Sequence, residues 1–192
     1  MRATCERAVR IGLPGLFFTE HLDLEDAWVS DHEDFDEHEA HLLDEDGVVS
    51  VPRFDVEGYL EGIDRCRAAF PELAIGTGLE FGQPGLRTDA ARAQLDLTVF
   101  DRIIGSLHTL ELDDHRVEPN TMFRRLTAGD VLRRYLAEVP TVVAADGPHE
   151  VVTHIDYPRP NTTEQNHHHC HRPEPTCRPR PSRLRTERSW SE

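Results

Sequence analysis

Four side chains that can bind metal ions each follow a short apolar run, at the point where a buried strand would end. They are His21, Glu80, His108 and His154. Imidazole nitrogens and carboxylate oxygens are ligands of intermediate hardness, and as a set they suit zinc, iron or manganese. Side chains at the carboxyl ends of neighbouring parallel strands meet on one rim. The pattern therefore predicts a divalent-metal site assembled from four strand ends.

The elements that would position these side chains alternate between strand-like and helix-like patterns. Strands are expected at residues 16–19, 73–79, 100–106 and 151–154. Helices are expected at 2–11, 55–70, 88–97 and 129–139, with a polar loop at 110–120. Asp55 and Thr127 are the expected caps of two of the helices, and Pro140 is expected to kink or stop the last one. Strands that are apolar throughout are typical of a parallel sheet covered by helices, so the pattern predicts an α/β fold.

Length and charge narrow the class of protein. With 192 residues the chain can form one domain with a sizeable core, but it is shorter than the usual eightfold barrel of about 250 residues. A formal charge of −15 argues against a general nucleic-acid surface. No apolar run reaches the ~18 residues that a membrane span needs, and no signal peptide opens the sequence. We expect a cytoplasmic protein without a disulfide framework.

An acidic segment at residues 23–46 interrupts the alternation and contains His32, His38 and His41. Two interpretations remain open. The segment is either a solvated insertion over the rim, where loops often determine specificity, or it contributes a second metal cluster.

The composition changes abruptly after residue 160. From 161 to 192 the sizeable apolar residues are Leu184 and Trp190, and six Arg stand against four Glu. Such a segment buries too little surface to offset the backbone ordering entropy of about 1–2 kcal/mol per residue. We therefore expect a domain at 1–160 and a disordered tail at 161–192. Its histidines, 167–169 and 171, together with Cys170 and Cys177, either have no function or bind zinc adventitiously.

Four motifs occur in a fixed order along the chain: Phe18-Thr19-Glu20-His21, Gly78-Leu79-Glu80, Gly105-Ser106-Leu107-His108 and Thr153-His154-Ile155-Asp156-Tyr157-Pro158. Together they resemble the polymerase and histidinol phosphatase (PHP) superfamily, and more narrowly its histidinol-phosphatase branch, from Met1 to about Pro160.

The resemblance implies a distorted (β/α)7 barrel with a trinuclear centre of divalent ions at its carboxyl rim. The implied reaction is hydrolysis of L-histidinol phosphate to L-histidinol and phosphate in histidine biosynthesis, so the partner would be a small phosphomonoester. His21, Glu80, His108 and His154 would be metal ligands. Arg159, directly after the last motif, would contact the substrate phosphate or would be an ordinary loop charge.

Two motifs of the family are missing from this sequence. The family opens with a strand ending in His-x-His and closes with a strand bearing Asp-x-His. We hypothesise that Met1 is an internal or misassigned start and that the reading frame shifts near Pro158–Pro160, which would leave an incomplete barrel. Three functions stay open: a phosphatase acting on histidinol phosphate or another phosphoester, an inactive fragment of the fold, and a non-catalytic metal-binding or partner-binding module.

Overall fold

The computed structural model describes residues 1–25, 28–32, 35, 37–38 and 40–158. The predicted tail at 161–192 and Arg159 lie outside these residues. The described part has an α/β fold with a parallel sheet, as the sequence predicted. None of its helices is long and apolar enough to cross a membrane.

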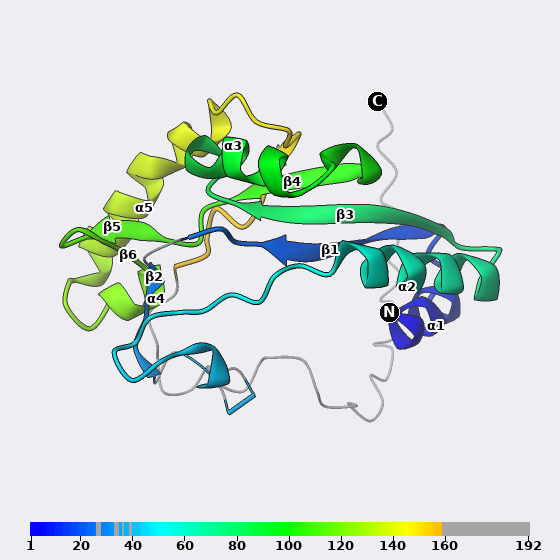
Figure 1. The fold of residues 1–192 in the computed structure, drawn as a ribbon, viewed down its shortest axis with the longest axis horizontal. Coiled ribbons are helices and arrows are strands. Elements are labelled where there is room, and N and C mark those ends of the chain that lie inside the picture. Colours follow the sequence, from blue (N-terminus) through cyan, green and yellow to red (C-terminus); the bar gives the residue numbers. More distant parts are fainter. Residues whose placement is uncertain (26–27, 33–34, 36, 39, 159–192) are drawn as a thin grey trace, which may run out of the picture. The chain divides into compact units, whose positions relative to one another are not determined.

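The main sheet has four strands, and all neighbouring pairs are parallel. Its strands, in spatial order, are β1 (Gly15–Leu22), β3 (Ala74–Gly82), β4 (Arg102–Ser106) and β7 (Val151–Val152). Figure 1 shows β1, β3 and β4 side by side with their arrows running in one direction. Because all neighbouring strands are parallel, the carboxyl ends of all four strands lie along one rim of the sheet.

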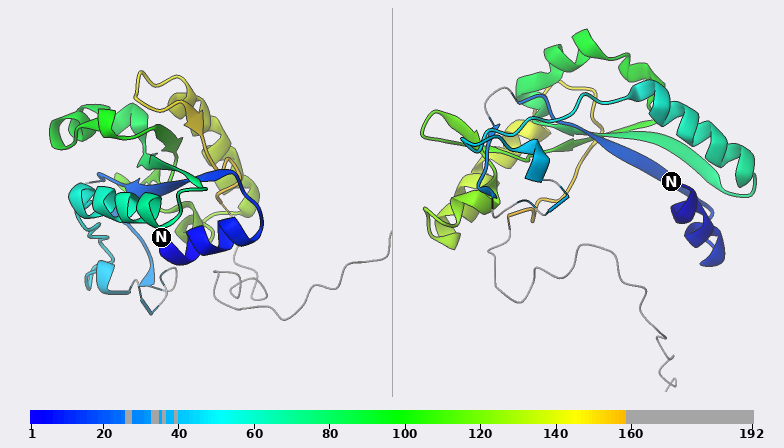
Figure 2. Two further views of the ribbon diagram at one scale, coloured as in Figure 1. Left: turned by 90° about the vertical axis from the view of Figure 1, so that its right-hand side faces the viewer. Right: turned by 60° about the horizontal axis from the view of Figure 1, so that its bottom comes forward.

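Helices connect and cover these strands, as Figure 2 shows from two further sides. They are α1 (Arg2–Arg10), α2 (Val56–Ala69), α3 (Pro84–Gln94), α4 (Pro119–Met122) and α5 (Ala128–Val143), with 3-10 turns η2 (Ala40–Leu42) and η3 (Leu97–Val99). Both predicted caps are confirmed. Asp55 accepts a hydrogen bond from Gly58 N at 3.0 Å, and Thr127 accepts one from Asp130 N at 3.2 Å.

The bounds of two helices differ from the prediction. Helix α3 begins at Pro84, directly after β3, because a proline suits the first helical turn and Gln83 turns the chain with a φ of 48°. Helix α5 continues past Pro140 to Val143, so of the two predicted effects of this proline, a kink or a stop, the stop was wrong. Pro140 removes one helical hydrogen bond, to the carbonyl of Leu136. The side chain of Leu136 is 55% exposed, which places this loss on the solvent side of the helix.

The predicted loop at residues 110–120 is instead ordered secondary structure. It forms a hairpin of β5 (Leu110–Leu112) and β6 (His115–Val117), followed by α4, and β2 (Trp28–Val29) pairs with β6 to complete a second sheet. Asp113 and Asp114 form the two-residue turn with φ values of 53° and 64°. Two consecutive positive φ angles match the twist of a tight hairpin, and Asp tolerates them better than most residues.

The buried apolar side chains form two clusters. One packs α1 and α2 against a face of the main sheet and includes Ile63, Leu79 and Phe81. The other joins α4 and α5 to the hairpin and includes Met122 and Tyr135. The first cluster includes Phe81 near the end of β3, and the second includes Leu107 directly after β4, so the two clusters hold the carboxyl ends of these strands.

The opposite face of the main sheet is partly open. Phe17 and Val151, on the two outer strands, are 51% and 49% exposed. Strand alternation places Phe17 on the same face as His21, whose register partner is Glu80. Parallel sheets are normally covered on both faces. The rim that bears the predicted ligands therefore adjoins a face that the described chain does not fully cover.

Candidate metal centre

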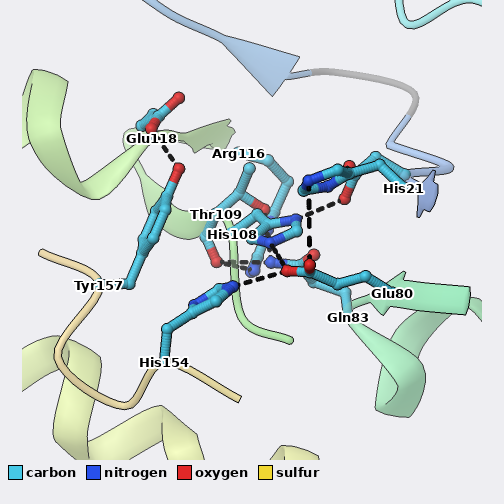
Figure 3. Close-up of polar contacts among 10 residues, drawn as sticks. His21, Glu80, Gln83, His108, Thr109, Arg116, Glu118, His154 and Tyr157 are labelled. Carbon is cyan, nitrogen blue, oxygen red and sulfur yellow. Dashed lines mark hydrogen bonds and ion pairs between the residues drawn. The ribbon is translucent and has the colours of Figure 1, made fainter. Parts of the chain in front are cut away.

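The four predicted ligands converge at the carboxyl rim of the main sheet. His21 and Glu80 lie near the ends of β1 and β3 and are register partners. His108 follows β4 by two residues, and His154 follows β7 by two residues. Figure 3 shows the three imidazoles turned toward the carboxylate of Glu80. Neighbouring parallel strands thus bring together residues that are far apart in sequence.

Glu80 is at the centre of the cluster. Its Oε1 lies 3.0 Å from His108 Nε2 and 2.6 Å from His154 Nε2. Its Oε2 lies 3.9 Å from His21 Nε2. One ligand atom from each of His21, Glu80 and His108 can be chosen such that all three lie within 4.8 Å of one another. Two bonds of about 2.0–2.2 Å, as zinc makes to nitrogen and oxygen, span nearly this distance, so the donors fit a single ion.

Asp23 completes the cluster, and the sequence analysis missed it. Its Oδ1 lies 2.7 Å from His108 Nδ1, and its Oδ2 lies 3.4 Å from His21 Nδ1. The analysis had placed Asp23 in the acidic segment after β1. Two signals could have identified it: it stands two positions after His21, and a histidine that binds a metal needs an acceptor for its other ring nitrogen.

The charged side chains in the cluster change one another's pKa values. Burial opposes the protonation of His108, but hydrogen bonds to Asp23 and Glu80 outweigh it and raise its pKa to about 10. Burial would raise the pKa of Asp23, but hydrogen bonds to His108 and His21 lower it to about 2. In Glu80 the same balance of burial against histidine contacts lowers the pKa. A metal ion would therefore replace the proton of His108 as the positive charge between these carboxylates.

The three imidazoles differ in their access to solvent. The side chain of His108 is 3% exposed, that of His154 29% and that of His21 60%. The rings of His21 and His154 flank that of His108, with centroid distances of 5.1 Å and 5.3 Å. Nδ1 of His154 is buried, and no group in the described chain pairs with it. The site is thus closed beneath His108 and most accessible beside His21.

Tyr157 borders the site next to His154. Its ring centroid lies 5.0 Å from that of His154 and 5.5 Å from that of His108. Its hydroxyl donates a hydrogen bond to Glu118, and burial together with this carboxylate raises the pKa of Tyr157. The sequence analysis quoted Tyr157 in a motif but gave it no role. It anchors the loop that bears His154 to α4.

Among the described residues, the histidines of the acidic segment do not form a second cluster. Within the described ranges, the one group of three or more possible metal ligands is His21, Glu80 and His108. His41 is engaged locally, with its Nδ1 2.7 Å from the carbonyl oxygen of His38. Arg159, the predicted phosphate contact, lies outside the described residues.

Comparison with known proteins supports the fold. The sequence matches no family model and no curated protein. The structure is similar to that of histidinol phosphate phosphatase from Lactococcus lactis subsp. lactis, which was crystallised with zinc, L-histidinol and phosphate. The TM-score is 0.56 at 22% sequence identity, over 81% of this chain and 51% of that protein. The resemblance predicted from the motifs is confirmed for the fold, and the chain spans about half the length of that phosphatase.

Proposed function

We propose that this chain is a metal-dependent phosphomonoester hydrolase of the histidinol-phosphatase type, acting on L-histidinol phosphate in histidine biosynthesis. The observation that supports this proposal most directly is the convergence of His21, His108 and His154 on Glu80 at the carboxyl rim of a parallel sheet. The similar fold of the Lactococcus lactis enzyme, which contains zinc and the two reaction products, supports the same conclusion.

His21, Glu80 and His108 would hold one divalent ion, with zinc, manganese and iron all compatible with the donor set, and His154 would lie beside it through its contact with Glu80. Such an ion lowers the pKa of a bound water and neutralises charge on the phosphoryl oxygens. The carboxylates of Asp23 and Glu80 offset the charge of the ion. The buried Nδ1 of His154 is a further polar atom that a bound group or water could satisfy.

Other residues of the chain position the ligands. Asp23 accepts a hydrogen bond from His108 Nδ1, so that with a metal ion in place of the Nε2 proton the neutral ring would present Nε2, on the side of Glu80, as its ligand atom. Tyr157 holds the His154 loop through Glu118. The exposed side of His21 leaves room for a phosphomonoester to approach, and Arg159 is proposed to contact its phosphate.

We further propose that the described chain forms part of a (β/α)7 barrel. Strands β1 and β7 are the outer strands of the main sheet, and Phe17 and Val151 are half exposed on the face that would line the barrel interior. A barrel that is not closed exposes strand edges and leaves its rim incomplete. We therefore expect this chain to bind fewer ions than a complete centre and to have weak activity.

The same exposed face favours a second candidate, an inactive fragment or metal-binding module that keeps the ligand cluster without turnover. Metal content and phosphate release distinguish the two functions. Purified chain would be loaded with zinc, manganese or iron, analysed for bound metal, and assayed for phosphate release from L-histidinol phosphate and from a simple aryl phosphate.

A single group of three close donors suits about one ion per chain. Bound metal with phosphate release that disappears in Glu80→Gln supports the phosphatase. Bound metal without release from either substrate supports the metal-binding module. Absence of bound metal would refute both functions.

A further inference from the structure

Asp23 contacts two histidines of the metal centre, although it lies outside any helix or strand. It follows β1 directly, and its side chain is 6% exposed. Its two carboxylate oxygens lie 2.7 Å from His108 Nδ1 and 3.4 Å from His21 Nδ1. Because this side chain is short, it keeps both contacts only if its surroundings hold it in one place. Two features of the structure do so: a gap at the end of β3 and a buried ion pair with α3.

Gly82, the last residue of β3, provides the gap. A Cβ atom built at this position would lie 2.1 Å from Asp23 Oδ1 and 3.4 Å from His108 Nδ1. Real Cβ atoms essentially never approach another heavy atom closer than 3.0 Å, so any side chain here would displace the carboxylate. Gly82 does not have a positive φ angle. The site therefore needs glycine because of Asp23, and the backbone conformation does not require it.

A buried ion pair fixes the segment that bears Asp23. Glu25, two residues further along the chain, accepts a hydrogen bond from Arg87 Nη2 at 2.8 Å. The side chain of Glu25 is 1% exposed and that of Arg87 is 22% exposed. A carboxylate buried to this extent is costly unless it is paired, so the ion pair holds the segment against α3.

The gap and the ion pair come from one short stretch of the chain. Helix α3 begins two residues after Gly82, and Arg87 is in its first half. Between them, Gln83 N donates to the Ser106 carbonyl at 2.9 Å, which ties the start of α3 to the end of β4. The segment after β1 is therefore held from one side by a single turn that joins β3 to α3.

We propose that three residues position the carboxylate of Asp23 in the metal centre. They are Gly82, Glu25 and Arg87. None of them is a proposed metal ligand, and each acts through Asp23. Asp23 in turn keeps a proton on His108 Nδ1, so that the ring would present Nε2 to a metal ion. The consequence for zinc rests on the proposed function, whereas the hold on Asp23 exists without metal and can be measured separately.

Gly82→Ala tests the gap. The added methyl group should push the Asp23 carboxylate away from His108 at little cost to the fold, because the end of a side chain can move. The signature is the His108 Nδ1 proton, which a buried hydrogen bond protects from exchange with water. Proton NMR of the metal-free, ¹⁵N-histidine-labelled chain should show this proton, and Gly82→Ala should lose it. Zinc affinity should fall about 10–100-fold, as when other acceptors of a ligating histidine are lost.

Gly85→Ala is the matched control for Gly82→Ala. A Cβ atom at Gly85 would lie 3.4 Å from the Thr141 carbonyl oxygen and 3.6 Å from Ala145 Cβ, which are ordinary contacts. This variant should keep both the proton signal and the zinc affinity. Circular dichroism and urea unfolding would verify that both variants fold. A signal and an affinity that Gly82→Ala leaves unchanged would overturn the proposal.

A double-mutant cycle tests the ion pair. Arg87→Met should weaken zinc binding about ten-fold in the unchanged background but less than two-fold in the Asp23→Asn background, because Arg87 acts through Asp23. Equal losses in the two backgrounds, or no loss in either, would show that the ion pair serves stability alone. Arg133→Met is the control, since Arg133 pairs with Asp130 and its side chain is 74% exposed. If Arg87→Met does not fold, Glu25→Gln combined with Arg87→Met leaves no buried carboxylate unpaired and takes its place.

The two measurements separate this inference from the proposed function. A chain that binds no zinc, but loses the His108 Nδ1 proton signal in Gly82→Ala, would refute the metal centre and support the positioning role. A chain that binds zinc equally well with and without the Gly82→Ala and Arg87→Met substitutions would keep the metal centre and refute the positioning role. Absence of the proton signal from the unchanged chain would also refute it.

Discussion

The two halves of the main sheet use polar side chains in opposite ways. In the amino-terminal half, polar groups pair mostly with the backbone and link neighbouring strands and helices. At the carboxyl rim, the clustered His, Asp and Glu side chains pair mostly with one another, and each of them can titrate. The first arrangement is complete within the chain, whereas the second leaves acceptors and a histidine nitrogen that a bound ion would satisfy.

The amino-terminal half illustrates complete pairing. The Tyr59 hydroxyl donates to the Phe18 carbonyl at 2.7 Å and accepts from Gly78 N at 2.8 Å, so it joins α2 to both β1 and β3. Thr77 N donates to Asp101 Oδ2 at 2.9 Å, and Asp101 N donates to Thr77 Oγ1 at 2.9 Å. This reciprocal pair fixes β3 against the start of β4.

The carboxyl rim illustrates the other arrangement. Asp23 and Glu80 place two carboxylates around His108, while His21 remains mostly exposed and His154 Nδ1 has no partner in the described chain. In parallel α/β sheets, ligands bind outside the carboxyl ends of the strands. Substitutions in the two halves should therefore change different measured quantities.

The largest effect is expected at Glu80. Glu80→Gln removes the carboxylate that all three imidazoles face but keeps the volume of the side chain. We expect zinc affinity to fall at least 100-fold, because the variant loses a direct ligand rather than a supporting contact, for which losses are about 10–100-fold. Elemental analysis and calorimetric titration with zinc measure this change.

Glu20→Gln is the matched control for Glu80→Gln. Glu20 is exposed and precedes His21, so strand alternation directs it to the opposite face of the sheet. Its substitution should leave zinc affinity unchanged. Equal zinc affinity in Glu80→Gln and the unchanged chain would refute the proposed metal centre.

A smaller effect is expected at Asp23. Asp23→Asn removes the negative charge next to His108 Nδ1 and His21 Nδ1 but leaves the proposed ligands in place. We expect zinc affinity to fall about 10–100-fold, as for other acceptors that orient a ligating histidine. Competition with a chelator of known affinity measures it. Asp114→Asn, in the hairpin turn, makes the same chemical change away from the site, and a comparable loss there would contradict the role of Asp23.

The sequence could predict those features that depend on local pattern. The caps Asp55 and Thr127 and the apolar stripes of α2 and α5 are local, and both helices were located from them. The four clustered residues could be found because each follows an apolar run, and parallel strands bring such positions together. Asp23 was missed because it begins a segment rich in Asp and Glu, where a single acidic residue does not stand out as a functional one.

Other features depend on contacts that the sequence does not display. Strands β5 and β6 have three residues each, too few for periodicity to show, and the turn at Asp113 and Asp114 was the available signal. Pro84 was a sequence signal for the early start of α3, but the turn before it also needs Gln83 in a left-handed conformation, and Gln83 bonds to Thr109, which lies 26 positions away in the chain. The open face behind Phe17 depends on which strands are neighbours, a property of the whole sheet.

In the amino-terminal half, Tyr59→Phe should change stability and leave metal binding intact. Loss of the hydroxyl leaves Gly78 N–H buried without its acceptor, which costs about 1–3 kcal/mol. Urea unfolding of the metal-free chain measures the loss, and zinc titration provides the second measurement. A fall in zinc affinity as large as that of Asp23→Asn would show that the two halves are not separate.

The smallest effect is expected from the protonation of Asp101. Hydrogen bonds from Thr77 N and Thr77 Oγ1 lower its pKa. Because the pKa is lower in the folded than in the unfolded chain, the ionised group stabilises the fold above its unfolded pKa. This stabilisation is lost as the pH falls through the lower, folded value. The side chain is 56% exposed, so screening should limit the contribution to less than about 1 kcal/mol.

Asp101→Asn isolates this contribution, because every other titrating group, including those of the rim, is common to both proteins. We expect the unchanged chain to be more stable than the variant at pH 7, by urea unfolding in the presence of a chelator. The difference should shrink as the pH is lowered toward 3, where the carboxylate becomes protonated. A difference that stays constant between these pH values would show that Asp101 stabilises the fold by shape and neutral hydrogen bonding alone. The Thr77–Asp101 pair would then owe none of its stability to charge, and its contrast with the titrating groups of the carboxyl rim would be sharper.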